Sequence, residues 1–144
     1  MHPFPHRYNV AATSATLGNV RISANNLPDI ESAPPLEFDG PGTVWSPETL
    51  LGAAVADCFI LTFRAIARAS KFEWSALECT LEARLERVEG GPQFTHFKTV
   101  ATLTVPAGTD LAKARLLMDK AEHGCLIANS LKGSRELLAS VVER

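Results

Sequence analysis

The long apolar segment between residues 46 and 70 constrains the fold of this chain more than any other feature. Ser46-Pro47-Glu48 is a strong helix start, because serine can cap free N–H groups, proline suits the first helical position and glutamate favours the positive end of the helix dipole. Hydrophobic residues then recur on nearly every side of the helix: Leu50, Leu51, Ala54, Val55, Phe59, Ile60, Phe63 and Ile66. We expect such a helix to be covered on most of its faces and to be the central element of the fold.

Length and charge exclude several classes of protein. The 144 residues suit one domain, residues 1–144, which can bury a core without a metal or a disulfide. The net charge is -2 with the charges interspersed, so we expect neither a nucleic-acid partner nor a membrane partner. Asp57 interrupts the apolar segment, which favours a buried helix over a membrane span. The N-terminus lacks the pattern of an export signal and there are three cysteines, which together indicate the cytoplasm.

The order of predicted elements indicates an α+β fold with antiparallel sheets and a long central helix. Short strands are expected within residues 7–38, namely 8–16 and 19–23, followed by the helix at 46–70. Residues 75–105 alternate between apolar and polar side chains on either side of Gly90-Gly91-Pro92, which predicts a long hairpin. A C-terminal helical part is expected over residues 109–144, with a helix capped by Thr109 and ended by Gly124. The tail from residue 134 fits either a helix or an edge strand.

Cys58 lies within the apolar helix, where a thiol is either inert packing or a protected nucleophile. Burial alone would raise its pKa and leave it inert, so a reactive Cys58 needs a nearby cation. The helix dipole fades within the first turn, which leaves a side chain as the source of that charge. Arginine is the natural candidate because it stays charged when buried, and a carboxylate would hold it in place. Cys79, by contrast, occupies an inward position of the alternating strand, where we expect packing.

Glu48 could be the carboxylate that holds such an arginine. It precedes Cys58 by ten residues, which in a straight helix corresponds to about 15 Å along the axis, too far for one compact site. Either the helix is broken or Glu48 serves the Cys58 of a partner subunit. A third interpretation is that Glu48 only favours the helix dipole.

Metal and cofactor motifs are weak or missing. His123-Gly124-Cys125 lacks the paired short spacings of structural zinc sites, so we expect no metal. The sequence has no Gly-x-Ser-x-Gly elbow, glycine-rich phosphate loop or dinucleotide fingerprint. We therefore expect no bound cofactor.

Two motifs resemble the OsmC/Ohr family of organic hydroperoxide reductases. The first runs from Ser46 to Phe59 and places proline, glutamate, a leucine-rich turn and Cys-Phe at the family's spacing; the second is residues 121–125, Ala-Glu-His-Gly-Cys. The element order is similar as well. The chain departs from the family in having Leu126 where proline usually follows the second cysteine. It also departs at the catalytic arginine of the N-terminal sheet, for which Arg21 is the nearest candidate and Arg7 another.

The resemblance implies an OsmC-like fold, an intertwined homodimer and a thiol-dependent peroxidase without a cofactor. Cys58 would attack an organic hydroperoxide and form a sulfenic acid, and Cys125 would condense with it to a disulfide. A dithiol reductant, for which a lipoyl protein is a candidate, would reduce the disulfide. Glu48 and Arg21 would complete the site, from a partner chain in the dimer. The alternative is a non-catalytic family member that senses redox state or binds a small apolar ligand.

Overall fold

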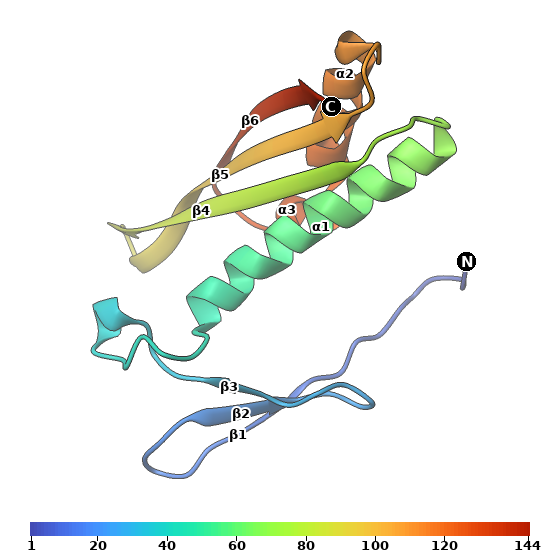
Figure 1. Cartoon of the computed structure of the whole chain (residues 1–144). Helices are drawn as coiled ribbons and strands as arrows, with labels where there is room; N and C mark the ends of the chain where they lie inside the picture. Colours follow the sequence, from blue (N-terminus) through green and yellow to red (C-terminus); the bar gives the residue numbers. More distant parts are fainter. The chain divides into compact units, whose positions relative to one another are not determined.

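The structure, a computed structural model, describes residues 1–144 and divides into two compact units, Met1–Leu50 and Leu51–Arg144. The first unit contains a small antiparallel sheet in the order β1-β2-β3, made of β1 (Ala11–Thr13), β2 (Val20–Ser23) and β3 (Ile30–Ser32) (Figure 1). A 3-10 turn, η1 (Leu36–Phe38), follows β3. The first strand is shorter than its predicted range, and β3 was not predicted, because its three residues lie in a stretch rich in turn-forming residues.

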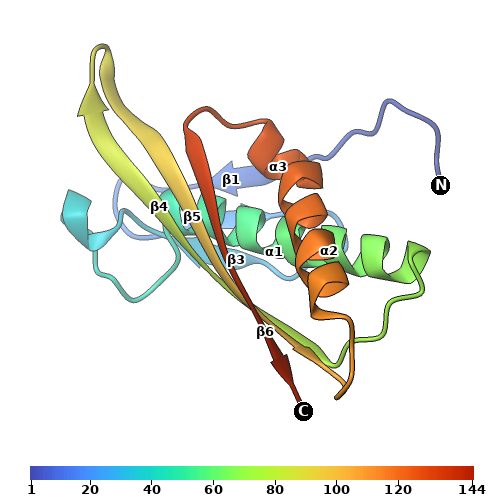
Figure 2. The same cartoon turned by 90° about the horizontal axis from the view of Figure 1, so that it is seen from above.

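The second unit is built on a three-stranded sheet in the order β4-β5-β6. β4 (Ala76–Val88) and β5 (Gly91–Val105) form the predicted hairpin, whose tip extends beyond the strand paired with β5 (Figure 2). The predicted alternation of β5 is confirmed, because every second residue is buried and the residues between them are more exposed. The buried residues are Phe97, Thr99, Ala101, Leu103 and Val105.

The C-terminal tail is a strand rather than a helix. β6 (Ser134–Glu143) pairs in parallel with β5, so that Arg135 lies opposite Phe97 and Val141 opposite Leu103. This sheet is therefore mixed and not antiparallel throughout as expected, because the helices α2 and α3 return the chain to the start of β5. The residues of β6 alternate between exposed and half-buried, the period of two expected for a strand with one covered face. The C-terminal helical part predicted to reach residue 144 therefore ends before β6.

α1 (Pro47–Ala69) begins as predicted, with the Thr49 N–H donating to Ser46 Oγ at 3.1 Å. It is the one helix that is long and apolar enough to cross a membrane by length and composition. Its buried residues form a single stripe at four-residue spacing: Val55, Phe59, Phe63 and Ala67. Within this chain α1 therefore buries one stripe of side chains, and the expectation that it is covered on most of its faces stays a prediction.

Two further helices connect β5 to β6. α2 (Leu111–Gly124) ends at Gly124 as predicted, but Asp110 caps it by accepting from the Lys113 N–H at 3.0 Å. Thr109 is not the cap, because its hydroxyl donates to the carbonyl of Pro106 instead. α3 (Leu126–Asn129) follows after a single residue. The core of the unit joins α1, α2 and the inner face of the sheet through side chains that include Phe59, Phe63, Leu103, Leu117 and Met118.

A candidate redox site between α1 and the α2–α3 turn

Cys58 lies in the middle of α1 and is half-buried. Its sulfur is 3.9 Å from the hydroxyl oxygen of Thr62, one helical turn further on. Cys58 also packs against a small apolar cluster formed by Val55, Cys125 and Ala128. The second unit therefore offers Cys58 a partly apolar wall that includes the second cysteine.

Cys125 is the single residue between α2 and α3 and is fully buried. Its backbone is extended, with φ -66° and ψ 102°, which turns the chain sharply between the two helices. Its sulfur lies 3.9 Å from the carbonyl oxygen of Val55, on the same face of α1 as Cys58. Both cysteines are free thiols. The fold thus brings Cys58 and Cys125, distant in sequence, into one cluster.

The surroundings of Cys125 favour its neutral thiol. The pKa of Cys125 is raised to about 11, first of all by burial. A backbone hydrogen bond with Ala128 acts in the opposite direction, while neighbouring Cys58 and the carboxylate of Glu122 add to the rise. A thiol with such a high pKa is a poor nucleophile towards a peroxide at neutral pH. These surroundings fit Cys125 better for the second step of a thiol reaction than for the first.

Gly124 allows the α2–α3 turn to approach α1 closely. A Cβ atom at this position would lie 3.3 Å from Cγ2 of Thr62, which is tighter than usual for side-chain contacts. Thr62 also faces the Cys58 sulfur. The absence of a side chain at Gly124 therefore helps to bring Cys125 next to the cysteine face of α1.

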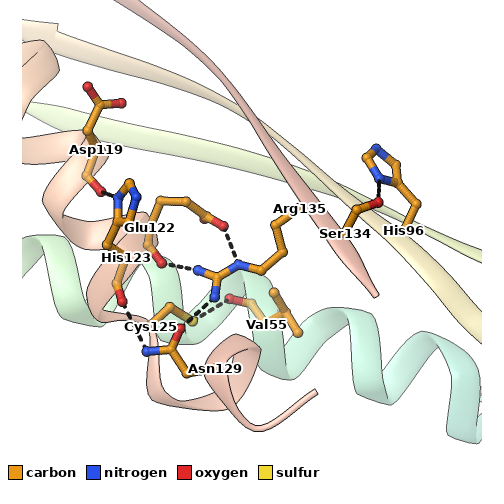
Figure 3. A network of polar contacts seen from close by, with 9 residues as sticks. All are labelled: Val55, His96, Asp119, Glu122, His123, Cys125, Asn129, Ser134 and Arg135. Carbon is orange, nitrogen blue, oxygen red and sulfur yellow. Dashed lines mark hydrogen bonds and ion pairs between the residues drawn. The ribbon is translucent and has the colours of Figure 1, made fainter. Parts of the chain in front are cut away.

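Arg135, which sequence reasoning missed, ties together both ends of this turn (Figure 3). Its Nε donates to Oε1 of Glu122 at 2.7 Å, and its other nitrogens donate to Oδ1 of Asn129 and to the carbonyl oxygen of Glu122. Asn129 in turn donates to the carbonyl of His123 at 3.0 Å. The signal in the sequence is the alternation of β6, in which Arg135 lies on the same inward face as Leu137.

Cys79 lies on β4 opposite Ala101 and packs against the core. Burial raises its pKa to about 11, with a smaller contribution from the carboxylate of Glu122. These features agree with the packing role predicted for Cys79. No group of three or more His, Cys, Asp or Glu side chains is placed to hold a metal ion.

Glu48 and Arg21 belong to the first unit. Glu48 is in the first turn of α1, and its Oε2 is buried without a hydrogen-bond partner. α1 is unbroken between Glu48 and Cys58, which removes the broken-helix alternative. Arg21 lies on β2, where its guanidinium is 3.6 Å from the carboxylate of Asp29 and both side chains are largely exposed.

Comparison with known families identifies the relatives of this chain. Residues 40–137 match the family of OsmC-like proteins. The chain belongs to this family. The resemblance to OsmC/Ohr proteins is therefore confirmed, and so is the expectation of an α+β fold of the OsmC type.

Two bacterial sequences illustrate the range of OsmC relatives. "Uncharacterized protein YmaD" of Bacillus subtilis (strain 168) is 32% identical over 108 residues, which cover 72% of this chain and 71% of that protein. "Peroxiredoxin OsmC" of Escherichia coli (strain K12) is 29% identical over 87 residues, and the match spans 60% of each chain. The relatives thus include one named as a peroxiredoxin and one without an assigned activity.

Solved OsmC structures share the fold over nearly the whole chain. An OsmC-like protein of unknown function from Vibrio cholerae superposes with a TM-score of 0.83 at 14% identity, covering 96% of this chain and 100% of the other. An organic hydroperoxide resistance protein OsmC from Legionella pneumophila gives a TM-score of 0.76 at 25% identity, covering 96% and 98%. The first similarity speaks for the fold alone.

Proposed function

We propose that this chain is a thiol-dependent peroxidase that reduces organic hydroperoxides through Cys58 and Cys125. The observation that carries the proposal is the packing of both free thiols in one cluster between α1 and the α2–α3 turn. Membership of a family that includes a protein named as a peroxiredoxin supports the same reaction.

The first step is attack of the Cys58 thiolate on one oxygen of a hydroperoxide ROOH. The O–O bond breaks, the alkoxide takes up a proton and leaves as the alcohol ROH, and Cys58 becomes a sulfenic acid. The thiol of Cys125 then attacks the sulfenic sulfur, which forms the Cys58–Cys125 disulfide and releases water. A dithiol reductant, with a lipoyl protein as a candidate, returns both cysteines to the thiol state by exchange.

The division of roles follows from the two environments. Cys58 is half-buried, whereas Cys125 is fully buried and its pKa is raised to about 11, mainly by burial. The half-buried thiol of Cys58 is the more accessible of the two and can meet a peroxide, and the buried thiol of Cys125 is protected from direct oxidation until its neighbour has reacted. The apolar residues around Cys58, among them Val55 and Leu81, favour an organic peroxide over hydrogen peroxide.

We assign Glu48 and Arg21 to the same reaction, acting across a homodimer. The distance along an unbroken α1 argues against Glu48 serving Cys58 of its own chain, since ten residues of helix span about 15 Å. The buried Oε2 of Glu48 has no partner, which supports a donor from outside the chain, such as an arginine. The guanidinium would stabilise the Cys58 thiolate and the developing negative charge on the leaving oxygen. We place this reaction in the cytoplasm.

Mass spectrometry tests the proposal directly. After one equivalent of cumene hydroperoxide, peptide mapping of the wild type should find a Cys58–Cys125 disulfide. Cys58→Ser should abolish peroxide consumption, Cys125→Ser should stop at the sulfenic acid, and Cys79→Ser serves as the matched control that retains both steps. A Cys58 that stays free after peroxide treatment contradicts the proposal.

Arg21 needs its own test because it is exposed and paired with Asp29. An exposed ion pair contributes about 0–1 kcal/mol, so Arg21→Met should leave the unfolding free energy almost unchanged. If Arg21 acts on the peroxide, the variant should lose about 100-fold or more in kcat/KM, as for other preorganised electrostatic groups. Arg7→Met is the comparison that separates the two candidate arginines.

The exposed pairing of Arg21 favours one second candidate function, a non-catalytic protein that senses redox state or binds a small apolar ligand. In that case Cys58 lacks a cation and should react slowly with iodoacetamide at mildly acidic pH. Rapid alkylation of Cys58 at pH 6 argues against this candidate and for the peroxidase.

A further inference from the structure

Arg135 is a charged residue at a position where the fold requires an inward side chain. Along β6 the inward face carries Leu137, Ala139 and Val141, all packed against the core, and Arg135 continues that row opposite buried Phe97. Only 22% of its side chain is exposed. A charge in such a place requires hydrogen-bonded partners, because an unpaired buried charge is strongly destabilising.

Those partners flank Cys125 on both sides. Glu122, three residues before the cysteine, accepts through its carboxylate at 2.7 Å and through its carbonyl oxygen, and Asn129, four residues after it, accepts at 2.5 Å. Asn129 also donates back to the carbonyl of His123. The guanidinium therefore joins the end of α2 to the end of α3 across the turn that holds Cys125 (Figure 3).

The local sequence would not favour this turn by itself. Glu122 lies in the last turn of α2, where the helix dipole disfavours a negative charge and carbonyl groups lack intrahelical partners. α3 has only four residues, too few to be stable in isolation. A contact from a different strand, β6, therefore supplies much of what holds the two helix ends together.

We propose that Arg135 is a positioning residue that fixes the α2–α3 turn and so determines how readily the Cys125 thiol reaches the Cys58 sulfur. The proposal rests on the Cys58–Cys125 disulfide of the proposed function, but it concerns formation of that bond by any oxidant. Arginine suits the role because its planar fork bonds several acceptors in fixed directions, whereas lysine provides a point charge.

The test measures the equilibrium between the protein and glutathione. Oxidation of the dithiol by glutathione disulfide gives the Cys58–Cys125 disulfide and two molecules of glutathione, so the equilibrium constant reports how well the two sulfurs are placed. The measurement is made in a Cys79→Ser background, by acid quenching and mass spectrometry. Arg135→Met should lower the constant about tenfold, the effect of losing one charge-assisted interaction.

Two variants define the role of the guanidinium. Arg135→Lys keeps the charge but should still lower the equilibrium constant several-fold, because lysine lacks the planar, forked guanidinium. Arg115→Met is the matched control, since Arg115 is exposed on α2 and should leave the constant unchanged. Far-UV circular dichroism and urea unfolding of the reduced proteins verify that every variant compared is folded. Equal constants for Arg135→Met and Arg115→Met overturn the proposal.

Leu126→Pro provides a rescue. Leu126 is the first residue of α3, is 66% exposed and follows a residue that is already extended. Proline is favoured at the first helical position and restricts the preceding residue to extended conformations, so it should stiffen the same turn. In the Arg135→Met background, Leu126→Pro should raise the equilibrium constant most of the way back to the wild-type value. A double variant with no recovery contradicts a role through the backbone of the turn.

The outcomes separate this inference from the proposed function. If the wild type forms the disulfide with glutathione disulfide, and Arg135→Met forms it less readily, the inference stands even where cumene hydroperoxide is not consumed. That result would contradict the proposed peroxidase activity and leave the role of Arg135 intact. If the wild type forms no Cys58–Cys125 disulfide with either oxidant, the inference falls.

Discussion

The sulfur of Cys125 lies 3.9 Å from the carbonyl oxygen of Val55, one turn before Cys58 on α1. This contact places the α2–α3 turn against the cysteine-bearing face of the long helix. It depends on the close approach that Gly124 allows and on the hydrogen bonds that Arg135 makes to both sides of the turn. The two thiols are therefore neighbours through packing and need no covalent link to stay together.

Alkaline pH should destabilise the fold through its buried thiols. Burial raises the pKa of both Cys79 and Cys125 to about 11, above the usual value of 9.0. Between these two values the unfolded chain has lost protons that the folded chain retains, so stability falls as pH rises from about 9 to about 11. Urea unfolding of the reduced protein across this range checks the prediction.

The control for the alkaline loss is the double variant Cys79→Ala/Cys125→Ala. It should show a shallower decline than the wild type, because lysine and tyrosine titrations remain but the two thiols are gone. Identical slopes for the two proteins would show that neither thiol has a raised pKa in the folded state.

Gly133→Ala should destabilise the start of β6. Gly133 has a φ of +101°, and a Cβ there would lie 2.9 Å from both the carbonyl carbon and oxygen of Thr95. We expect a loss of more than about 2 kcal/mol, combining the strain of positive φ with a clash against backbone. The matched control is Gly90→Ala, where φ is +95° but the space is open, so only the strain of the positive φ should reduce stability. Equal losses in chemical denaturation would mean that the contact with Thr95 is unimportant.

Asp110→Ala should weaken the N-terminus of α2. The carboxylate of Asp110 accepts from the Lys113 N–H at 3.0 Å, and loss of such a cap costs about 0.5–2 kcal/mol. Asp110→Asn retains an acceptor and should lose much less. The midpoint of urea unfolding measures both effects, and similar midpoints for alanine and asparagine would contradict the capping role.

Leu61→Glu should disrupt the homodimer that we propose. Leu61 is 48% exposed on α1, outside the buried stripe of that helix, and a charge there would disfavour an apolar contact with a second copy. Leu116→Glu, at a residue 52% exposed on α2, is the control that should leave the assembly unchanged. Light scattering after size-exclusion chromatography distinguishes monomer from dimer. A wild-type monomer, or a Leu61→Glu dimer, would contradict this assignment.

Strong local patterns made most of the fold predictable. The helix at 46–70 and the hairpin at 75–105 agree with α1 and β4–β5 to within a residue or so at each end, because capping and periodicity act within a few neighbours. β3 was missed because three residues in a turn-rich stretch carry no period. The sequence did not distinguish a helix from a strand in the tail, because its apolar residues fit the spacing of either: Leu137, Leu138, Val141 and Val142. Pairing with β5 selects the strand.

The candidate site was less accessible to sequence reasoning. Cys58 could be recognised as special from its helix, but its proximity to Cys125 came only with the family resemblance, since no local rule joins distant segments. Arg135 carried a signal in the alternation of its strand, yet its partners Glu122 and Asn129 depend on how α2 and β6 pack. Glu48 and Arg21 belong to the first unit and remain predictions.

The parallel pairing of β6 with β5 has a consequence for the synthesis of the protein. The ribosome completes β4, β5 and the segment with Cys125 before it adds the ten residues of β6. Arg135 belongs to β6, so the contacts that hold the Cys125 turn can form only after this strand has been made. A nascent chain that stops before β6 therefore carries both thiols without the arrangement that directs them towards each other, and the redox pair matures only once β6 has been added.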